Sequence, residues 1–283
     1  MNIRYFFHND TFTFTYIVSD TSTKKCAVID PVLDYNIHTG RTKTTFADKI
    51  IEYINDNNLT VEWLLETHAH ADHITAANYL KREIGGKTGI GENIKEVIKF
   101  WVPIFNTESD TPLNGSQFDH LFKDQEIINI GNLDVKIIYT PGHTPACVSY
   151  LIKDSIFVGD TIFMPHMGTA RTDFPGGSSK TLYQSIQKIY QLPNETKIYV
   201  GHDYPPEGQK PEAVSTVLEQ KQKNNMINQE ISESEYVSLR NSKNKGKPVP
   251  NLLLPSIQVN IRCGDFGKKE NNTNYIKIPI NKI

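Results

Sequence analysis

The stretch from Glu66 to Asn78, "ETHAHADHITAAN", decides how this chain is interpreted. Three histidines and one aspartate lie within its six residues from His68 to His73, directly after the apolar run in "VEWLLET". Imidazole and carboxylate groups are the usual protein ligands of zinc and iron, and a loop at a strand end presents them from a rigid position. A polar loop with incidental histidines is the alternative, but four candidate ligands this close together favour a metal site.

Three more candidate ligands follow at the ends of other apolar runs. His143 lies in "YTPGHTPACVSY", Asp160 ends "SIFVGD", and His202 lies at the end of "KIYVGHD". An aspartate at the end of an apolar run is costly to bury unless it is paired or bound to a cation. Each residue alone would be typical of a turn. Together they predict four strands that each place a metal ligand at the carboxyl end.

Composition indicates an ordinary globular protein. Of its 283 residues, 38% are hydrophobic and 22% are charged, and the net charge of −2 does not favour nucleic acid or an anionic membrane as a partner. No apolar run approaches the roughly 18–20 residues that span a bilayer. Three scattered cysteines, Cys26, Cys147 and Cys263, do not form a disulfide framework, so we expect a cytoplasmic protein.

The order of predicted elements indicates an α+β fold. The first 35 residues alternate as two or three strands, and "TTFADKIIEYINDNN" predicts a helix with Phe46, Ile50, Ile51 and Ile54 on one face. A strand, "VEWLLET", comes before a helix, "ITAANYLKREIGG", which we expect Asp72 and His73 to begin. Strands follow in "DQEIINIGNLDVKIIYT" and in "CVSYLIKDSIFVGD", with a hairpin turn at 153–155, and then a helix, "SSKTLYQSIQKIYQL", and a strand, "TKIYVGHD". Two packed sheets with helices outside, an αββα sandwich, suit this order.

We expect residues 1–265 to form a single domain and the tail, 266–283, to be partly disordered because it is weakly patterned. The segment 221–247 is rich in Asn, Lys, Gln and Ser, and it predicts a solvated helix and loop. Cys147 is interpreted as a core residue. For Cys263 we expect a small residue packed in a C-terminal strand, with a modifiable thiol as the alternative.

The ligand pattern resembles that of the metallo-β-lactamase superfamily: an H-x-H-x-D-H motif followed by a lone His, a lone Asp and a lone His. Its members here are His68, His70, Asp72, His73, His143, Asp160 and His202. The resemblance covers roughly residues 2–204. It implies an αββα sandwich of two mixed sheets with a metal site at the edge between them. It leaves the reaction open, because the superfamily includes hydrolases, nucleases and oxidases.

Other stretches narrow the resemblance. "GTARTDFPGGSSKTLYQSI" is similar to a region shared by persulfide dioxygenases and glyoxalase II, whereas "HDYPPEG", "VSTVLEQ" and "PSIQVNIRCGDF" resemble the persulfide dioxygenase branch. The likeness is greatest to its bacterial β-lactamase-like-hydrolase subgroup, which also has an extended loop like 34–45 and an insertion like 100–122. One departure is Asn224-Asn225-Met226, where glutathione-using members have Asn-Pro-Arg. A cation for a glutathione carboxylate is therefore missing at Met226.

The resemblance implies one Fe²⁺ per chain, held by His68, His143 and Asp160, which is the ligand type of non-haem oxygenases. The other four members of the motif set would then line the pocket and hydrogen-bond to the ligands. The implied reaction oxidises the terminal sulfur of a small persulfide, such as glutathione persulfide, to sulfite with O₂. Asp72 and Tyr204 are the candidates for a catalytic role.

Two residues are expected to contact the substrate. Arg171 is predicted to bind a carboxylate of the thiol carrier, because a guanidinium matches that group with two hydrogen bonds. A salt bridge to Asp173 is the alternative role for Arg171. Tyr204, directly after the last ligand strand, is the second candidate for a substrate contact.

Two other functions stay open. In the first, all seven ligands bind one or two Zn²⁺ ions, and the protein is a thioester hydrolase of the glyoxalase II type with a metal-activated hydroxide. In the second, the protein is a metal-binding sensor or scaffold that retains the site. The sequence leaves the metal, the thiol carrier and the oligomeric state open, a homodimer included.

Overall fold

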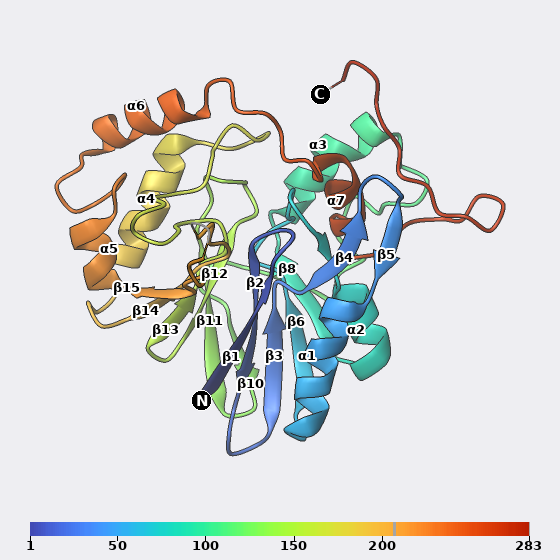
Figure 1. Ribbon diagram of the computed structural model, residues 1–283, viewed down its shortest axis with the longest axis horizontal. Coiled ribbons are helices and arrows are strands. Elements are labelled where there is room, and N and C mark those ends of the chain that lie inside the picture. Colours follow the sequence, from blue (N-terminus) through green and yellow to red (C-terminus); the bar gives the residue numbers. More distant parts are fainter. Residues whose placement is uncertain (206–207, 283) are drawn as a thin grey trace.

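Two six-stranded sheets carry the fold, which a computed structural model describes for residues 1–205 and 208–282 (Figure 1). The strand orders are β1-β2-β3-β6-β8-β9 and β10-β11-β12-β13-β14-β15. Side chains from both sheets form one buried cluster between them, for example Tyr16 of the first sheet with Phe157 of the second. The predicted sandwich of two mixed sheets is confirmed.

The first sheet comprises β1 (Asn2–His8), β2 (Thr13–Ser19), β3 (Lys25–Ile29), β6 (Thr60–Leu65), β8 (Lys87–Gly91) and β9 (His120–Phe122). Its first three strands are antiparallel, and the rest run parallel to β3. In β2, Phe14 and Tyr16 face the second sheet while Ile17 packs under the helices. The period of two in strand side chains therefore gives this strand two buried faces.

The second sheet comprises β10 (Ile127–Ile130), β11 (Leu133–Tyr139), β12 (Val148–Ile152), β13 (Ser155–Phe157), β14 (Lys197–Tyr199) and β15 (Val214–Thr216). All neighbours are antiparallel except β13 and β14. The hairpin predicted at 153–155 is confirmed, because Ile152 pairs with Ser155 across the turn.

Helices cover the outer face of each sheet (Figure 1). On the first sheet lie α1 (Thr45–Asp56), α2 (Ala77–Ile84), α3 (Ile94–Phe105) and α7 (Leu253–Asn260), and on the second lie α4 (Ser179–Tyr190), α5 (Val217–Lys223) and α6 (Glu233–Asn244). The predicted apolar face of α1 buries Phe46, Ile50 and Ile54. The four layers are thus helix, sheet, sheet and helix.

A small third sheet forms beside the ligand motif from β5 (Arg41–Lys43), β4 (Val32–Asn36) and β7 (Ile74–Thr75). The expected extended loop at 34–45 is therefore largely a hairpin. The prediction that Asp72 and His73 begin a helix is wrong, since β7 pairs with β4 first. The helix begins at Ala77, whose N–H donates to Thr75 Oγ1 at 3.0 Å.

Two predictions in the C-terminal third are wrong in part. Cys263 does not lie in a strand, because "PSIQVNIRC" forms the helix α7 and then a turn. The helix is buried on opposite sides, where Ile257 and Val259 both find apolar partners. The segment 221–247 does contain a helix, but Met226, Tyr236 and Arg240 are buried rather than solvated.

Part of the tail is attached to α7. The Gln258 side chain donates to the Lys277 carbonyl at 2.8 Å and accepts from the Lys277 N–H at 3.0 Å. Partial disorder of residues 266–283 stays a prediction. None of the helices in the described part of the chain is long and apolar enough to cross a bilayer.

Candidate metal centre

The predicted ligands meet at one edge of the sandwich. His68 follows β6, His143 follows β11, Asp160 follows β13 and His202 follows β14. The prediction that four strand ends supply these residues is confirmed. All four side chains are at least nine-tenths buried.

The ligand atoms form two groups. One atom each from His68, His143 and Asp160 lies within 4.8 Å of the other two. One atom each from His70, Asp72 and His73 does the same. His202 lies between the groups, with its Nε2 3.2 Å from Asp72 Oδ2 and 3.3 Å from Asp160 Oδ1.

Each histidine of the cluster has one ring nitrogen beside a fixed oxygen. The contacts are His68 Nδ1 to Thr67 Oγ1 (3.0 Å), His70 Nε2 to Asp30 Oδ1 (3.1 Å), His73 Nδ1 to the Ile74 carbonyl (3.4 Å), His143 Nδ1 to the Arg171 carbonyl (2.8 Å) and His202 Nδ1 to the Phe12 carbonyl (3.1 Å). Carbonyls and carboxylates accept, so they assign the ring proton to the nitrogen beside them. When the ring is neutral, the other nitrogen carries a lone pair, as a metal ligand requires.

Among the described residues, the candidate ligand atoms that point toward one another lack hydrogen-bond partners. Within residues 1–205 and 208–282 no partner exists for these buried atoms: His68 Nε2, His70 Nδ1, His73 Nε2, His202 Nε2, Asp72 Oδ2 and Asp160 Oδ1. Buried polar atoms are almost always satisfied. The acceptor atoms of His68, His73, Asp72 and Asp160 converge here without donors, which fits a bound cation.

Electrostatics keep two of the imidazoles neutral. Burial lowers the pKa of His68 well below its usual value, and the neighbouring histidines lower it further. Burial and His70 do the same to the pKa of His73. A neutral imidazole is the form that binds a metal, so the fold prepares these rings as ligands.

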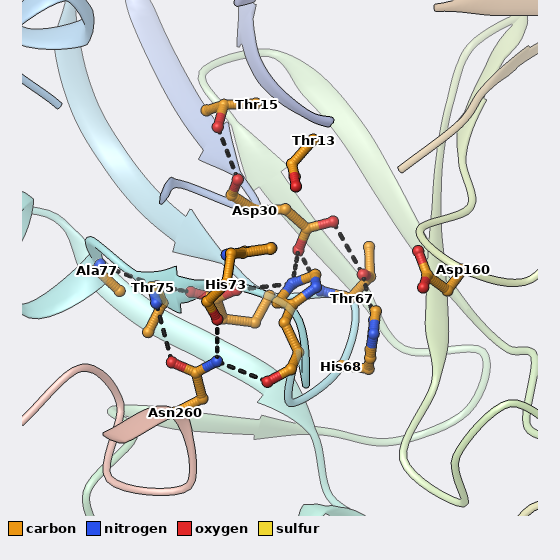
Figure 2. Close-up of polar contacts among 12 residues, drawn as sticks. Thr13, Thr15, Asp30, Thr67, His68, His73, Thr75, Ala77, Asp160 and Asn260 are labelled. Atoms are coloured by element: carbon orange, nitrogen blue, oxygen red, sulfur yellow. Dashed lines mark hydrogen bonds and ion pairs between the residues drawn. The ribbon is translucent and has the colours of Figure 1, made fainter. Parts of the chain in front are cut away.

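Two buried carboxylates, Asp30 and Glu66, contact His70 Nε2, and neither was among the predicted site residues. Asp30, after β3, accepts from the Thr67 N–H at 2.7 Å, from Thr67 Oγ1 at 2.9 Å and from His70 (Figure 2). Glu66 Oε2 lies 3.3 Å from His70 Nε2. Burial opposes protonation of His70, but Asp30 and Glu66 raise its pKa well above the usual value. The run "CAVID" carries the same signal as Asp160, an aspartate after apolar residues, and could have identified Asp30.

Asn260, at the end of α7, holds the motif loop from the other side. Its Nδ2 donates to the carbonyls of His70 and His73, both at 2.8 Å, and its Oδ1 accepts from the Thr75 N–H at 2.9 Å (Figure 2). Asn260 is buried. Nothing in the local sequence indicates this role, because its partners lie far away in the chain.

A pocket of about 300 Å³ opens beside Asp72, His143 and Asp160, and Arg171 and Tyr204 are part of its wall. Tyr204 is 44% exposed, and its ring stacks on His202 with a centroid distance of 6.0 Å. The pocket therefore gives a small molecule access to the ligand cluster.

Arg171 forms the salt bridge that was its alternative role. Its Nε and Nη2 donate to the two oxygens of Asp173 at 2.6 and 2.7 Å, and its Nη1 donates to the Pro248 carbonyl at 2.7 Å. The guanidinium therefore joins two parts of the pocket wall.

Cys147 and Cys263 are both buried, and burial raises the pKa of both thiols. Cys147 is buried in the core, as predicted. Cys263 lies in another pocket, with Thr88 and Arg262, and burial raises the pKa of its thiol to about 12. A thiol with this pKa is not a thiolate at neutral pH, which argues against ready modification of Cys263.

The sandwich and its cluster of buried ligands at the sheet edge define an αββα protein with a candidate metal centre. Residues 8–202 match the family described as the Metallo-beta-lactamase superfamily. The chain belongs to this superfamily.

Its relatives carry names with different reactions. The chain is 51% identical to "Glyoxylase B2" of Dictyostelium discoideum, over 94% of this chain and 92% of that protein. It is 46% identical to a "Beta-lactamase hydrolase-like protein" of Xylella fastidiosa, over 98% of this chain but only 64% of that longer protein. It is 31% identical to the human mitochondrial persulfide dioxygenase ETHE1, over 93% of this chain and 88% of that protein.

Among solved structures, the fold is similar to that of ETHE1 from Myxococcus xanthus. The TM-score is 0.74 with 27% sequence identity, over 94% of this chain and all of that one. The persulfide dioxygenase branch is thus represented among both the sequence relatives and the structural neighbours.

Proposed function

We propose that this protein is a mononuclear non-haem iron persulfide dioxygenase that acts on a small persulfide. The observation that carries the proposal is the separate group of His68, His143 and Asp160. Two imidazoles and one carboxylate on one side of a metal leave positions open for two reactants, which is the ligand set of non-haem Fe²⁺ oxygenases. The similarity to the human and Myxococcus proteins supports this assignment.

His70 also favours one metal rather than two, because Asp30 and Glu66 raise its pKa and a protonated ring has no lone pair for a second ion. His70 Nε2 lies 3.1 Å from Asp30 Oδ1 and 3.3 Å from Glu66 Oε2. These three side chains form a separate buried group. In the proposed enzyme His70 stays hydrogen-bonded to these carboxylates and stiffens the loop that carries His68. Rigid support of this kind orients a metal ligand without binding the metal.

The overall reaction consumes the persulfide, O₂ and water. The S–S bond breaks, the terminal sulfur leaves as sulfite with both oxygen atoms of O₂ and one from water, and the carrier is released as a thiol. The sulfur is oxidised and O₂ is reduced, so no other oxidant is required. Fe²⁺ would supply the electron transfer and the positions at which the two reactants meet.

The chain itself supplies binding and orientation. The Arg171 carbonyl fixes the ring of His143, and Asp72 and Tyr204 lie at the pocket wall where the substrate enters. We assign Asp72 and Tyr204 to orienting the persulfide and the water. Holding both reactants beside one metal removes much of the entropy cost of their encounter.

A zinc thioester hydrolase is the second candidate. The group of His70, Asp72 and His73, with His202 beside it, could hold another metal ion, and more similar relatives have glyoxalase-like or hydrolase-like names. Two metal ions could activate a hydroxide for attack on the thioester carbonyl.

The deciding experiment compares both reactions on protein purified without metal and reloaded with Fe²⁺ or Zn²⁺. We expect the iron form to consume O₂ and produce sulfite from glutathione persulfide, and Asp160→Ala to remove the activity. The zinc form should be inactive with persulfides. If the zinc form hydrolyses S-lactoylglutathione rapidly and neither form consumes O₂ with any small persulfide, the hydrolase is the correct assignment.

A further inference from the structure

The pocket beside the metal centre is strongly cationic away from the ligands. Arg171, Arg240, Lys243 and Lys247 all line it. The acidic residues among its described lining, Asp72 and Asp160, both belong to the ligand cluster. The far end of the pocket therefore carries an excess of positive charge.

Two of these cations differ in their hydrogen bonds. The Arg171 guanidinium is hydrogen-bonded to Asp173 and Pro248, whereas one nitrogen of the Arg240 guanidinium lacks a partner in the described part of the chain. Arg240 is only 2% exposed, and it donates through Nη1 to the Thr169 carbonyl at 2.9 Å and through Nε to Asn244 Oδ1 at 3.0 Å. Its Nη2 is buried and has no hydrogen-bond partner in the part of the chain that the structure describes. A buried cationic donor without a partner is expensive, and an anionic ligand in the pocket would satisfy it.

Helix α6 holds Arg240 firmly in this place. The helix begins with a capping box between Ser232 and Glu235. Tyr236, one turn before Arg240, is fully buried, and its hydroxyl lies 2.8 Å from Thr169 Oγ1. The guanidinium is therefore preorganised, which reduces the entropy cost of binding a ligand.

Arg240 also explains the departure at Met226. Its Nη1 lies 3.8 Å from Met226 Sδ, and both side chains line the pocket. The resemblance to glutathione-using members indicated that a cation is missing at this position of the chain. The tertiary structure brings one to the same place from α6, in the segment that was expected to be solvated.

The positive charges of Arg240 and Arg171 act on the neighbouring Lys247. Partial burial lowers the pKa of Lys247, and the neighbouring Arg240 and Arg171 lower it further. Lys243 and Lys247 are exposed at the pocket, whereas Arg240 lies inside. An anion bound between them would relieve the repulsion.

We propose that Arg240 is the anion-binding residue of this pocket, that Lys243 and Lys247 assist at its mouth, and that the substrate carries a carboxylate remote from its reacting sulfur. Phe163, Met167 and Phe174 form apolar wall elsewhere in the pocket, which suits a short organic carrier. The sulfur chemistry of this substrate rests on the proposed function, but the carboxylate does not. The role of Arg171 is then to hold the pocket wall.

Binding measurements test the role of Arg240 in anion binding without turnover. The probes are S-methylglutathione and its dimethyl ester, which lacks the free carboxylates, titrated calorimetrically into metal-free and zinc-loaded protein. We expect Arg240→Gln, whose amide nitrogen takes the position of Arg240 Nε and can still donate to Asn244 Oδ1, to weaken binding of the acid by about tenfold or more and to leave the weak binding of the ester unchanged. Lys243→Gln should weaken binding of S-methylglutathione less than Arg240→Gln does. Lys245→Gln is the matched control, because Lys245 is exposed but outside the pocket lining.

Kinetics with two matched persulfides give the second readout. The persulfide of 3-mercaptopropionate carries a carboxylate, and that of 2-mercaptoethanol carries a neutral hydroxyl. Arg240→Gln should raise KM for the first by about tenfold with little change in kcat, and should leave KM for the second unchanged. If Arg240→Gln does not fold, the double variant Lys243→Gln/Lys247→Gln should shift the same ratio in the same direction.

Equal effects on the acid and the ester, or on both persulfides, would overturn the proposal. Full affinity for S-methylglutathione in a folded Arg240→Gln variant would overturn it as well. If the wild type oxidises no persulfide at all, the proposed function fails, while the calorimetric comparison still decides whether Arg240 binds a carboxylate.

Discussion

Asp160 Oδ1 lies 3.3 Å from His202 Nε2, and neither atom has a hydrogen-bond partner in residues 1–205 and 208–282. The other oxygen of Asp160 lies 3.7 Å from His143 Nε2. One carboxylate thus stands where the two groups of candidate ligands meet. Asp160 would hold a single metal together with His68 and His143, and a second metal would need the group of His70, Asp72 and His73. The number of metals therefore separates the two candidate functions.

The first prediction concerns this number. In the mononuclear enzyme, Ala at His68, His143 or Asp160 should abolish both iron binding and turnover. Asp72→Ala and His202→Ala should retain iron and lose about 10–100-fold in affinity or activity, since they remove only a supporting contact. Metal analysis of the variants at matched protein concentration measures this directly. A wild type with two tightly bound metals per chain, of which both Asp72→Ala and His202→Ala lose one, would contradict the mononuclear proposal.

The second prediction concerns Asn260. Asn260→Ala removes the donor to the His70 and His73 carbonyls, so it should lower the free energy of unfolding by about 1–3 kcal/mol. It should also lower metal affinity by about 10–100-fold, because the motif loop loses its support. Denaturant unfolding and metal titration check the two effects.

Gln258→Ala is the control on the same helix. Gln258 is equally buried but hydrogen-bonds to Leu254 and to Lys277 of the tail rather than to the motif loop. This variant should be less stable than the wild type and should keep its metal affinity. Equal losses of metal affinity in both variants would show that Asn260 acts only through the stability of α7.

The third prediction distinguishes the two roles of Arg171. If Arg171 holds the pocket wall, Arg171→Ala and Asp173→Ala should both raise KM, because each breaks the bridge that orients the guanidinium. Both should retain the metal. If Arg171 instead binds the substrate, Arg171→Ala alone should raise KM, because about 1.5–3 kcal/mol of binding free energy from charge-assisted hydrogen bonds is lost. Asp173→Ala should then leave KM unchanged or lower it. Steady-state kinetics on both variants decides between these outcomes.

The fourth prediction is a pH dependence of stability away from the metal centre. Asp119 accepts from Lys81 Nζ and from the N–H and hydroxyl of Thr88. Burial opposes ionisation of Asp119, but these contacts outweigh it and lower the pKa. Asp119 therefore stabilises the fold above its unfolded pKa of about 3.9, and this contribution is lost as the pH falls through the lower folded pKa.

Asp119→Asn should accordingly lower Tm at pH 7. The difference from the wild type should begin to shrink as the pH falls below about 4 and should vanish below the lowered folded pKa, where the aspartate is protonated in both states. Thermal unfolding across this range measures it. A Tm difference that does not change with pH would mean that the charge of Asp119 contributes nothing.

The sequence by itself determined the fold class and the set of candidate ligands. The strands that end at His68, His143, Asp160 and His202 could be predicted because apolar runs and the polar residues that terminate them are local signals. Parallel neighbouring strands such as β13 and β14 then bring such ends to one edge of a sheet. The strand expected at Cys263 was wrong, since the helix before it is buried on opposite sides and has no polar face to reveal its period.

Only the tertiary structure decided what surrounds the ligands. Asp30 and Asn260 hold the motif loop from two sides, and Arg240 reaches the pocket beside Met226. These contacts join residues far apart in the chain, so no local spacing encodes them. Arg240 lies in a segment whose polar composition predicts exposure, and it becomes buried because Tyr236 anchors its helix against the pocket wall. Composition reports the average environment of a segment, whereas packing decides the environment of each side chain.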